Sequence, residues 1–214
     1  MNGLGADKAP VTVDPGSLVC VARTTVYLAN GGRWVFQKWG HGPTTDCVTL
    51  SSPGSYKAFY THEVLLQVRS SVGDIQRSTW IVAGEPVTLQ APDTVAKGER
   101  ARYKFQLWDR GQTPFLPTNT IAVLAPAQVE AKWTAEHLLQ VDGPAGAAVQ
   151  GSGWYQEGSS AVLQAPDIVE SQASGERMKF ARWESVGSRP LTISGGDKPL
   201  MTVKVEAAYN IRAV

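Results

Sequence analysis

The chain has 214 residues, of which 43% are hydrophobic and 18% are charged, so it can bury a core and is not expected to be disordered. Its net charge is +1 and it contains no basic run that could follow a phosphate backbone, so nucleic acid is not expected as a partner. No apolar stretch reaches the roughly 20 residues of a membrane-spanning helix, and "MNGLGADKAP" has no signal-peptide pattern. The chain is expected to be either cytoplasmic or a mature or excised fragment.

The N-terminal part divides into a linker and a first β unit. Residues 1–9 are expected to be a linker or disordered, and residues 10–61 form the first predicted repeat, which holds both cysteines, Cys20 and Cys47. The pair fits one disulfide, a bond that persists in oxidising compartments, and it fits two buried free thiols equally well. Neither cysteine belongs to a CxxC pair, so redox and zinc chemistry are not expected.

An internal repeat relates residues 62–134 to residues 135–214. "LLQV", "LQAPD" and "GER" occur in both, "KFQLW" recurs as "KFARW", and "VEAKW" recurs as "VEAAY", which aligns Ala131 with Ala207. Landmarks in the same order at a nearly constant spacing indicate a chain of repeated supersecondary units. The first repeat is a shorter copy, in which "WVFQKW" matches "YKFQLW" and the opening strand is missing.

Hydrophobic residues alternate with polar ones inside each repeat, which is the pattern of β-strands with one buried face. "MTVKVEAAY" predicts a single strand, 201–209, with Met201, Val205 and Tyr209 on the inward side. "APAQVEAKWTAEHLLQV" has a composition that suits a helix, but its repeat partner is that strand, so a strand is expected there too. The predicted fold is all-β, with three tandem small antiparallel β-sandwich or open-barrel (Ig-like) units.

Aromatic residues recur at one place in each repeat. A tryptophan follows a phenylalanine by three positions each time, and burial of such a pair would supply much of a small core. Glycines before the "VTL"-type strand, Gly84 and Gly158, are expected in turns with positive φ. The aromatic positions are Phe36, Trp39, Phe105, Trp108, Phe180 and Trp183.

The run "HLLQV", "GWYQEGSSAVLQAP", "MKFARW", "PLTI" and "MTVKVEAAY" resembles the bacterial modules related to internalin B-repeats and their counterparts in bacterial and archaeal surface and S-layer proteins. The resemblance covers the second and third repeats and about half of the first, where "VTVDPGSLVCVA" departs from the pattern. It implies a secreted, tandem, structural or adhesive β module without catalysis.

Catalytic chemistry finds little support in the sequence. The histidines His41, His62 and His137 are separated along the chain and suggest neither a triad nor a zinc site. Nothing singles out a carboxylate pair of the kind that a glycosidase needs. No catalytic residue, metal or cofactor is expected.

Two features remain open. Trp80, Trp154 and Tyr155 lie near hairpin turns, where aromatics either stack on a sugar or a neighbouring domain, or fold over their own core. The terminal "YNIRAV" either supplies a strand to the open edge of another copy's first repeat or reflects a ragged boundary of an excised segment.

The expected function is a non-catalytic structural or adhesive repeat segment of an extracellular, cell-surface, S-layer or filament protein. Its expected partners are other protein domains, copies of itself or the cell envelope, with a glycan as a further candidate. The alternative is a carbohydrate-binding accessory module of a secreted enzyme, for which Trp80, Trp154 and Tyr155 would form the binding face.

Overall fold

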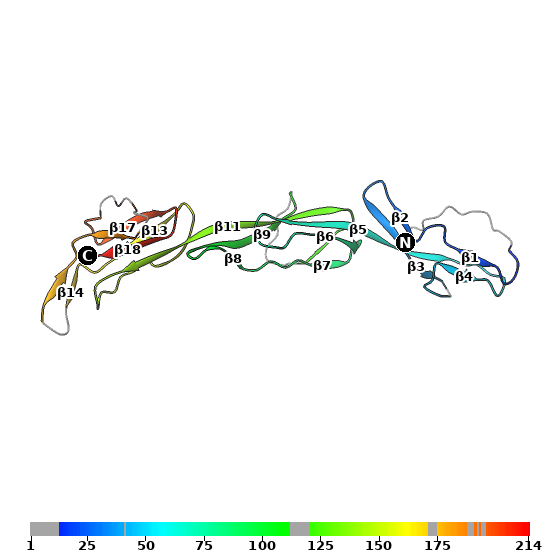
Figure 1. Cartoon of the computed structure of the whole chain (residues 1–214), viewed down its shortest axis with the longest axis horizontal. Helices are drawn as coiled ribbons and strands as arrows, with labels where there is room; N and C mark the ends of the chain where they lie inside the picture. The colour runs from blue at the N-terminus through cyan, green and yellow to red at the C-terminus, as the bar shows by residue number, and fades with distance from the viewer. Residues whose placement is uncertain are drawn as a thin grey trace. The chain divides into compact units, whose positions relative to one another are not determined.

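The structure is a computed structural model that describes residues 13–40, 42–111, 120–170, 175–187, 191, 193 and 196–214. All regular elements in this part of the chain are β-strands (Figure 1). The prediction of an all-β fold is therefore confirmed, including a strand rather than a helix from Ala127 onward in the helix-friendly segment. No helix long and apolar enough to cross a membrane occurs among the described residues.

The chain divides into two compact lobes. Lobe 1 combines Met1–Gln90 with Leu107–Ala131, and lobe 2 combines Ala91–Gln106 with Lys132–Val214. The predicted division into three sandwich units at 61 and 134 stays a prediction. Residues 1–9, predicted as a linker, lie outside the described residues.

Lobe 1 is organised around one long strand. Its strands are β1 (Leu18–Cys20), β2 (Thr25–Tyr27), β3 (Gly32–Trp39), β4 (Cys47–Thr49), β5 (Ala58–Ser70), β6 (Arg77–Val82), β7 (Pro86–Thr88) and β10 (Thr120–Ala122). β5 pairs antiparallel with β3 along its first half and with β6 from Glu63 to Val68. Position 61, the predicted end of the first repeat, therefore lies within a continuous strand.

Lobe 2 has a comparable arrangement. Its strands are β8 (Thr94–Gly98), β12 (Gly153–Gln156), β13 (Ser159–Gln164), β14 (Ile168–Glu170), β15 (Arg177–Lys179), β16 (Trp183–Val186), β17 (Leu200–Val205) and β18 (Tyr209–Ala213), and β9 (Ala101–Asp109) and β11 (Ala127–Asp142) contribute residues to both lobes. β11 pairs with β12 and with β18, and β13 pairs with β17. In β13 and β17 buried and exposed residues alternate, as the period of two predicts.

The predicted tryptophan core is present in both lobes. Trp39 and Trp108 are 6% and 1% exposed in lobe 1, and Trp183 is 4% exposed in lobe 2. Gly84 and Gly158 have φ values of +85° and +80°, so the predicted turn conformation is confirmed. Around Trp183 the core of lobe 2 contains Leu139, Val141, Ala161, Leu163, Ala165, Met201, Val203, Val205, Ile211 and Ala213.

The two cysteines form a disulfide. Cys20 on β1 and Cys47 on β4 lie directly opposite each other in an antiparallel pair and are bonded. Of the two alternatives that the sequence left open, the disulfide is the one observed. The bond closes the loop that contains β2 and β3, and so stabilises the part of lobe 1 in which the repeat pattern is weakest.

The prediction of purely antiparallel pairing is wrong. In lobe 1, Val129 of β11 pairs in parallel with Val68 of β5, and in lobe 2, Ile211 of β18 pairs in parallel with Val141 of β11. The physical reason is the connection: the strand that ends a repeat returns beside the strand that opened it, after a long crossover through the intervening strands.

The alignment of the last strand is also corrected. Because Val68 and Val141 are equivalent in the two "LLQV" runs, their parallel partners Val129 and Ile211 are equivalent as well, which aligns Ala131 with Ala213 rather than with Ala207. The predicted continuous strand over 201–209 is interrupted after Val205. "VEAAY" resembles "VEAKW" in letters, but it occupies a different place in the sheet.

Candidate functional sites at the repeat junctions

An arginine, a glutamate and a tryptophan meet where the second and third predicted repeats join. Arg102 on β9 donates from Nε to Glu136 Oε2 on β11 at 2.7 Å, with side chains 29% and 12% exposed. The Arg102 guanidinium carbon also lies 4.2 Å from the ring centre of Trp154 on β12. One planar cation thus binds a carboxylate at its edge and an indole at its face, two interactions that arginine makes simultaneously.

The same cluster occurs where the first and second predicted repeats join. Arg33 on β3 donates from Nε to Glu63 Oε2 on β5 at 2.8 Å, and its terminal nitrogen lies 2.7 Å from the same oxygen. Its guanidinium carbon is 4.1 Å from the ring centre of Trp80 on β6, which also contacts Tyr27 edge to face. We call Arg33, Glu63 and Trp80 the first junction cluster, and Arg102, Glu136 and Trp154 the second.

Strand register explains why these side chains meet. Glu63 and Leu65 lie on the same face of β5, since they are two residues apart. Arg33 is directly opposite Glu63 on one neighbouring strand, and Trp80 is directly opposite Leu65 on the other. The arginine side chain therefore crosses the central strand to reach the indole, and its aliphatic stem covers the sheet between them.

The sequence contains a signal for these clusters in the spacing of their residues. Each arginine precedes its phenylalanine by three positions, in "RWVF" and "RYKF", and each glutamate follows its aromatic by three positions, in "YTHE" and "WTAE". Neither pattern reveals which residues face each other, because that depends on pairing between distant strands.

The predicted binding residues Trp80, Trp154 and Tyr155 are all partly buried. One face of each tryptophan is covered by the arginine of its junction cluster. Tyr155 packs beside the core of lobe 2 and donates its hydroxyl hydrogen to the Gly151 carbonyl at 3.0 Å. Trp154 and Tyr155 are consecutive on β12, so their side chains point to opposite faces, and Trp80 lies on β6 in lobe 1. Sugar binding by these residues stays a prediction.

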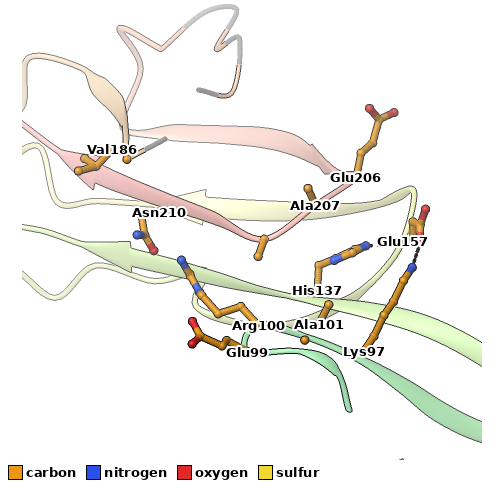
Figure 2. Close-up of a pocket in the computed structure, with 13 residues that line it drawn as sticks. Lys97, Glu99, Arg100, Ala101, His137, Glu157, Val186, Glu206, Ala207 and Asn210 are labelled. Carbon is orange, nitrogen blue, oxygen red and sulfur yellow. Dashed lines mark hydrogen bonds and ion pairs between the residues drawn. The ribbon is translucent and has the colours of Figure 1, made fainter. Parts of the chain in front are cut away.

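A polar pocket lies beside the second junction cluster in lobe 2. It has a volume of about 790 Å³, and its lining includes His137, Glu157 and Lys97. Both His137 and Lys97 point toward Glu157, at 3.4 Å and 3.5 Å from Oε2 (Figure 2). The hydrogen bond from His137, followed by the charge of Lys97, lowers the pKa of the Glu157 carboxyl.

The pocket contains a small network of charged and polar side chains. Glu157 is half exposed whereas His137 is buried, so water reaches only one side of the pair. The lining contains no Ser, Thr or Cys among the described residues, so it offers no hydroxyl or thiol nucleophile there. Glu157, in the turn after β12, is linked by these contacts to Lys97 on β8 and to His137 on β11.

The other histidines lie elsewhere. His62 on β5 stacks on Trp34 with ring centres 4.8 Å apart, and His41 lies outside the described residues. Within the described segments, no group of three His, Cys, Asp or Glu side chains is arranged to hold a metal ion.

Comparisons with known proteins add one short similarity. No family model matches the chain, and no solved structure matches it. Among curated proteins the chain is similar to "Putative monooxygenase p33MONOX" of Gallus gallus, with 36% identity over 52 residues, which are 24% of this chain and 18% of that protein. The chain thus spans less than a fifth of that protein's length, and the similarity does not show a family.

Proposed function

We propose that this chain is a non-catalytic structural or adhesive repeat segment of an extracellular protein, of the kind found in cell-surface, S-layer or filament assemblies. One observation carries the proposal: the same cluster of guanidinium, carboxylate and indole is built twice, each time from residues of two successive predicted repeats. Repetition of a chemical group at the junctions favours a role in holding repeats together.

The strands at the junctions support the same proposal. β5 is 13 residues long and β11 is 16 residues long, and each passes through a predicted repeat boundary without a break. A side-chain cluster that crosses such a strand adds contacts between residues of successive predicted repeats. In repeat proteins such nearest-neighbour interfaces determine stability and spacing.

The Cys20–Cys47 disulfide supports the proposed setting, because such a bond is compatible with an oxidising compartment. A test in the native cells combines alkylation of free thiols with mass spectrometry, and antibody labelling of intact cells. The proposal predicts that both cysteines are protected until a reductant is added and that intact cells are labelled. Free thiols together with labelling only after lysis would contradict it.

The alternative function is carbohydrate binding by an accessory module, with Trp80 and Trp154 as stacking platforms. This alternative is supported by the partial exposure of both rings, because a sugar could reach them. Glycan-array binding that is lost in Trp154→Ala and retained in Leu200→Ala, a substitution of a 59% exposed residue on β17, would favour it over the structural proposal. The structural proposal predicts no glycan binding by the wild-type chain.

A further inference from the structure

Each junction contains an aromatic pair in addition to its cluster. In lobe 1, Phe36 packs edge to face on Tyr60 with ring centres 5.6 Å apart. In lobe 2, Phe105 packs in the same way on Trp133 at 5.4 Å. Tyr60 and Trp133 each begin an aromatic–Thr–x–Glu segment, "YTHE" and "WTAE", whose glutamate belongs to the junction cluster. An incoming strand of this pattern therefore places one aromatic and one carboxylate on the preceding repeat.

The third repeat has the receiving half of such a junction. Trp39 is paired with Ala58 in lobe 1, and Trp183 is paired with Ala213 in lobe 2, so these pairs are equivalent. By the same alignment Phe180 corresponds to Phe36 and Phe105, and Arg177 corresponds to Arg33 and Arg102.

The receiving half is open in lobe 2. Arg177 on β15 is exposed and forms no ion pair with a described carboxylate, unlike its two equivalents. β15 pairs with β14 and has no second partner strand among the described ones, so its other edge is available for hydrogen bonding. In lobe 1 the equivalent edge of β3 is occupied, because it pairs with β5.

An apolar cavity lies where the aromatic would be seated. It has a volume of about 870 Å³, and its lining includes Val169, Met178, Phe180 and Val214. Met178 is 40% exposed and lines the cavity together with Phe180, which packs against the core of lobe 2. An indole or phenol ring that enters this cavity would cover the exposed side of Phe180 as Tyr60 covers Phe36, and would remove apolar surface from water.

We infer that the edge of β15, with Arg177 and the cavity beside Phe180, is a docking site for an extended strand of sequence aromatic–Thr–x–Glu, supplied by a further β repeat of this class. The incoming aromatic enters the cavity, the glutamate pairs with Arg177, and the backbone adds to β15 as a strand. This inference rests on the proposed structural function and adds the partner that the function needs.

A second copy of this chain is a poor occupant. Its own "YTHE" and "WTAE" segments are already engaged, because Tyr60 packs on Phe36 and Trp133 packs on Phe105 within their lobes. Its terminal strand is not free either, since β18 is paired on one side with β11 and on the other with β16. Of the two alternatives for "YNIRAV", donation of a strand to another copy is not supported for Tyr209–Ala213, which pairs within its own chain.

The experiment uses the full chain and a fluorescent peptide of sequence WTAEHLLQV, which copies residues 133–141. Fluorescence anisotropy should show saturable binding. A peptide with alanine in place of Trp133, and one with arginine in place of Glu136, should each bind about tenfold more weakly or worse. In NMR spectra, the backbone amide chemical shifts of Arg177–Lys179 should change when the peptide binds.

A charge exchange makes the test specific. Arg177→Glu should lose the wild-type peptide and gain the peptide that carries arginine in place of Glu136, whereas Lys204→Glu, an exposed substitution on β17, should change neither affinity. Arg177 is exposed, so its variant should fold, which circular dichroism checks. Equal binding of all peptides, no binding, or a dimer of the chain that excludes the peptide would overturn the inference. Such a failure would not affect the outcomes of the thiol-alkylation and cell-labelling experiments that test the proposed function.

Discussion

The arginines of the junction clusters combine two interactions that a lysine cannot combine. The Arg102 guanidinium presents its nitrogens in a plane to Glu136 while the face of that plane lies on Trp154. An ammonium group is a strongly hydrated point charge and would satisfy the carboxylate or the ring, but not both in this geometry. The identity of the residue is therefore determined by geometry as well as by charge.

Arg102→Ala should destabilise the chain by about 1–2 kcal/mol, since it removes an ion pair that is largely shielded from water and a cation–π contact. Arg182→Ala is a matched control, because Arg182 also pairs with a glutamate, Glu184, but its side chain is 60% exposed. The control should change stability by less than about 0.5 kcal/mol. Urea unfolding followed by tryptophan fluorescence measures both, and equal effects of the two substitutions would contradict this account.

Glu157 should make stability depend on pH. Its pKa is lowered from 4.5 in the folded chain, mainly by the hydrogen bond from His137, so the stabilisation is complete above that ordinary value and is lost as the pH falls through the lower folded value. Glu157→Gln should lower the free energy of unfolding at pH 7 by less than about 1 kcal/mol, because the carboxylate is half exposed, and the urea midpoint should fall with it. The two midpoints should converge in acid. A difference between the two urea midpoints that widens in acid would contradict the lowered pKa of Glu157 in the folded chain.

Glycines at the β12–β13 hairpin differ in what surrounds them. Gly158 has positive φ and no atom within 4 Å of an added Cβ, so only backbone strain opposes a side chain there. At Gly151, which also has positive φ, an added Cβ would lie 2.6 Å from Leu163 Cδ2 and 2.9 Å from the Val162 carbonyl oxygen. The first glycine serves the turn, and the second allows two segments to approach closely.

Gly158→Ala should therefore cost about 1 kcal/mol, the strain of an L-residue in the left-handed region. Gly151→Ala should cost clearly more, because a backbone atom cannot move aside as a flexible side chain can. Thermal unfolding of the two variants compares them directly. The ranking fails if Gly158→Ala is the less stable variant.

Strand positions were predictable from sequence to the extent that they depend on local patterns. The alternation in Met201, Val203 and Val205 and the positive φ of Gly84 and Gly158 follow from residues close together in the chain. The place of Ala213 did not follow, because the similarity of "VEAAY" to "VEAKW" favoured another alignment. Strand pairing over long separations decides between such alternatives, and local letters do not record it.

The candidate sites show the same limit. The aromatics Trp80 and Trp154 were identified from their places near turns, but their arginine and glutamate partners lie on other strands and were missed. The two clusters are recognisable once the strand pairing is known, because the same three residue types meet in each lobe.

At the scale of the molecule, the disulfide lies in lobe 1, whereas the second junction cluster lies in lobe 2. Reduction of Cys20–Cys47 should destabilise lobe 1 by about 3 kcal/mol, as expected for a closed loop of this size, and should leave lobe 2 unchanged. Hydrogen exchange with and without reductant, read at β3 and at β13, resolves the two lobes. Equal loss of protection in both would contradict their independence.

The same combination of residue types occurs at both boundaries between predicted repeats. The first and second junction clusters use the same three residue types, and Arg177 presents the same cation on an exposed edge. A serial arrangement of this kind transmits force along the chain if each junction holds.

Single-molecule pulling of the full chain from its two ends tests that claim most directly. The wild-type chain is compared with the double variant Arg33→Ala, Arg102→Ala and with the control Arg182→Ala. The account predicts that loss of both junction arginines lowers the force at which the chain first yields, while the control leaves that force unchanged. An unchanged force in the double variant would show that the junction clusters do not hold successive repeats together.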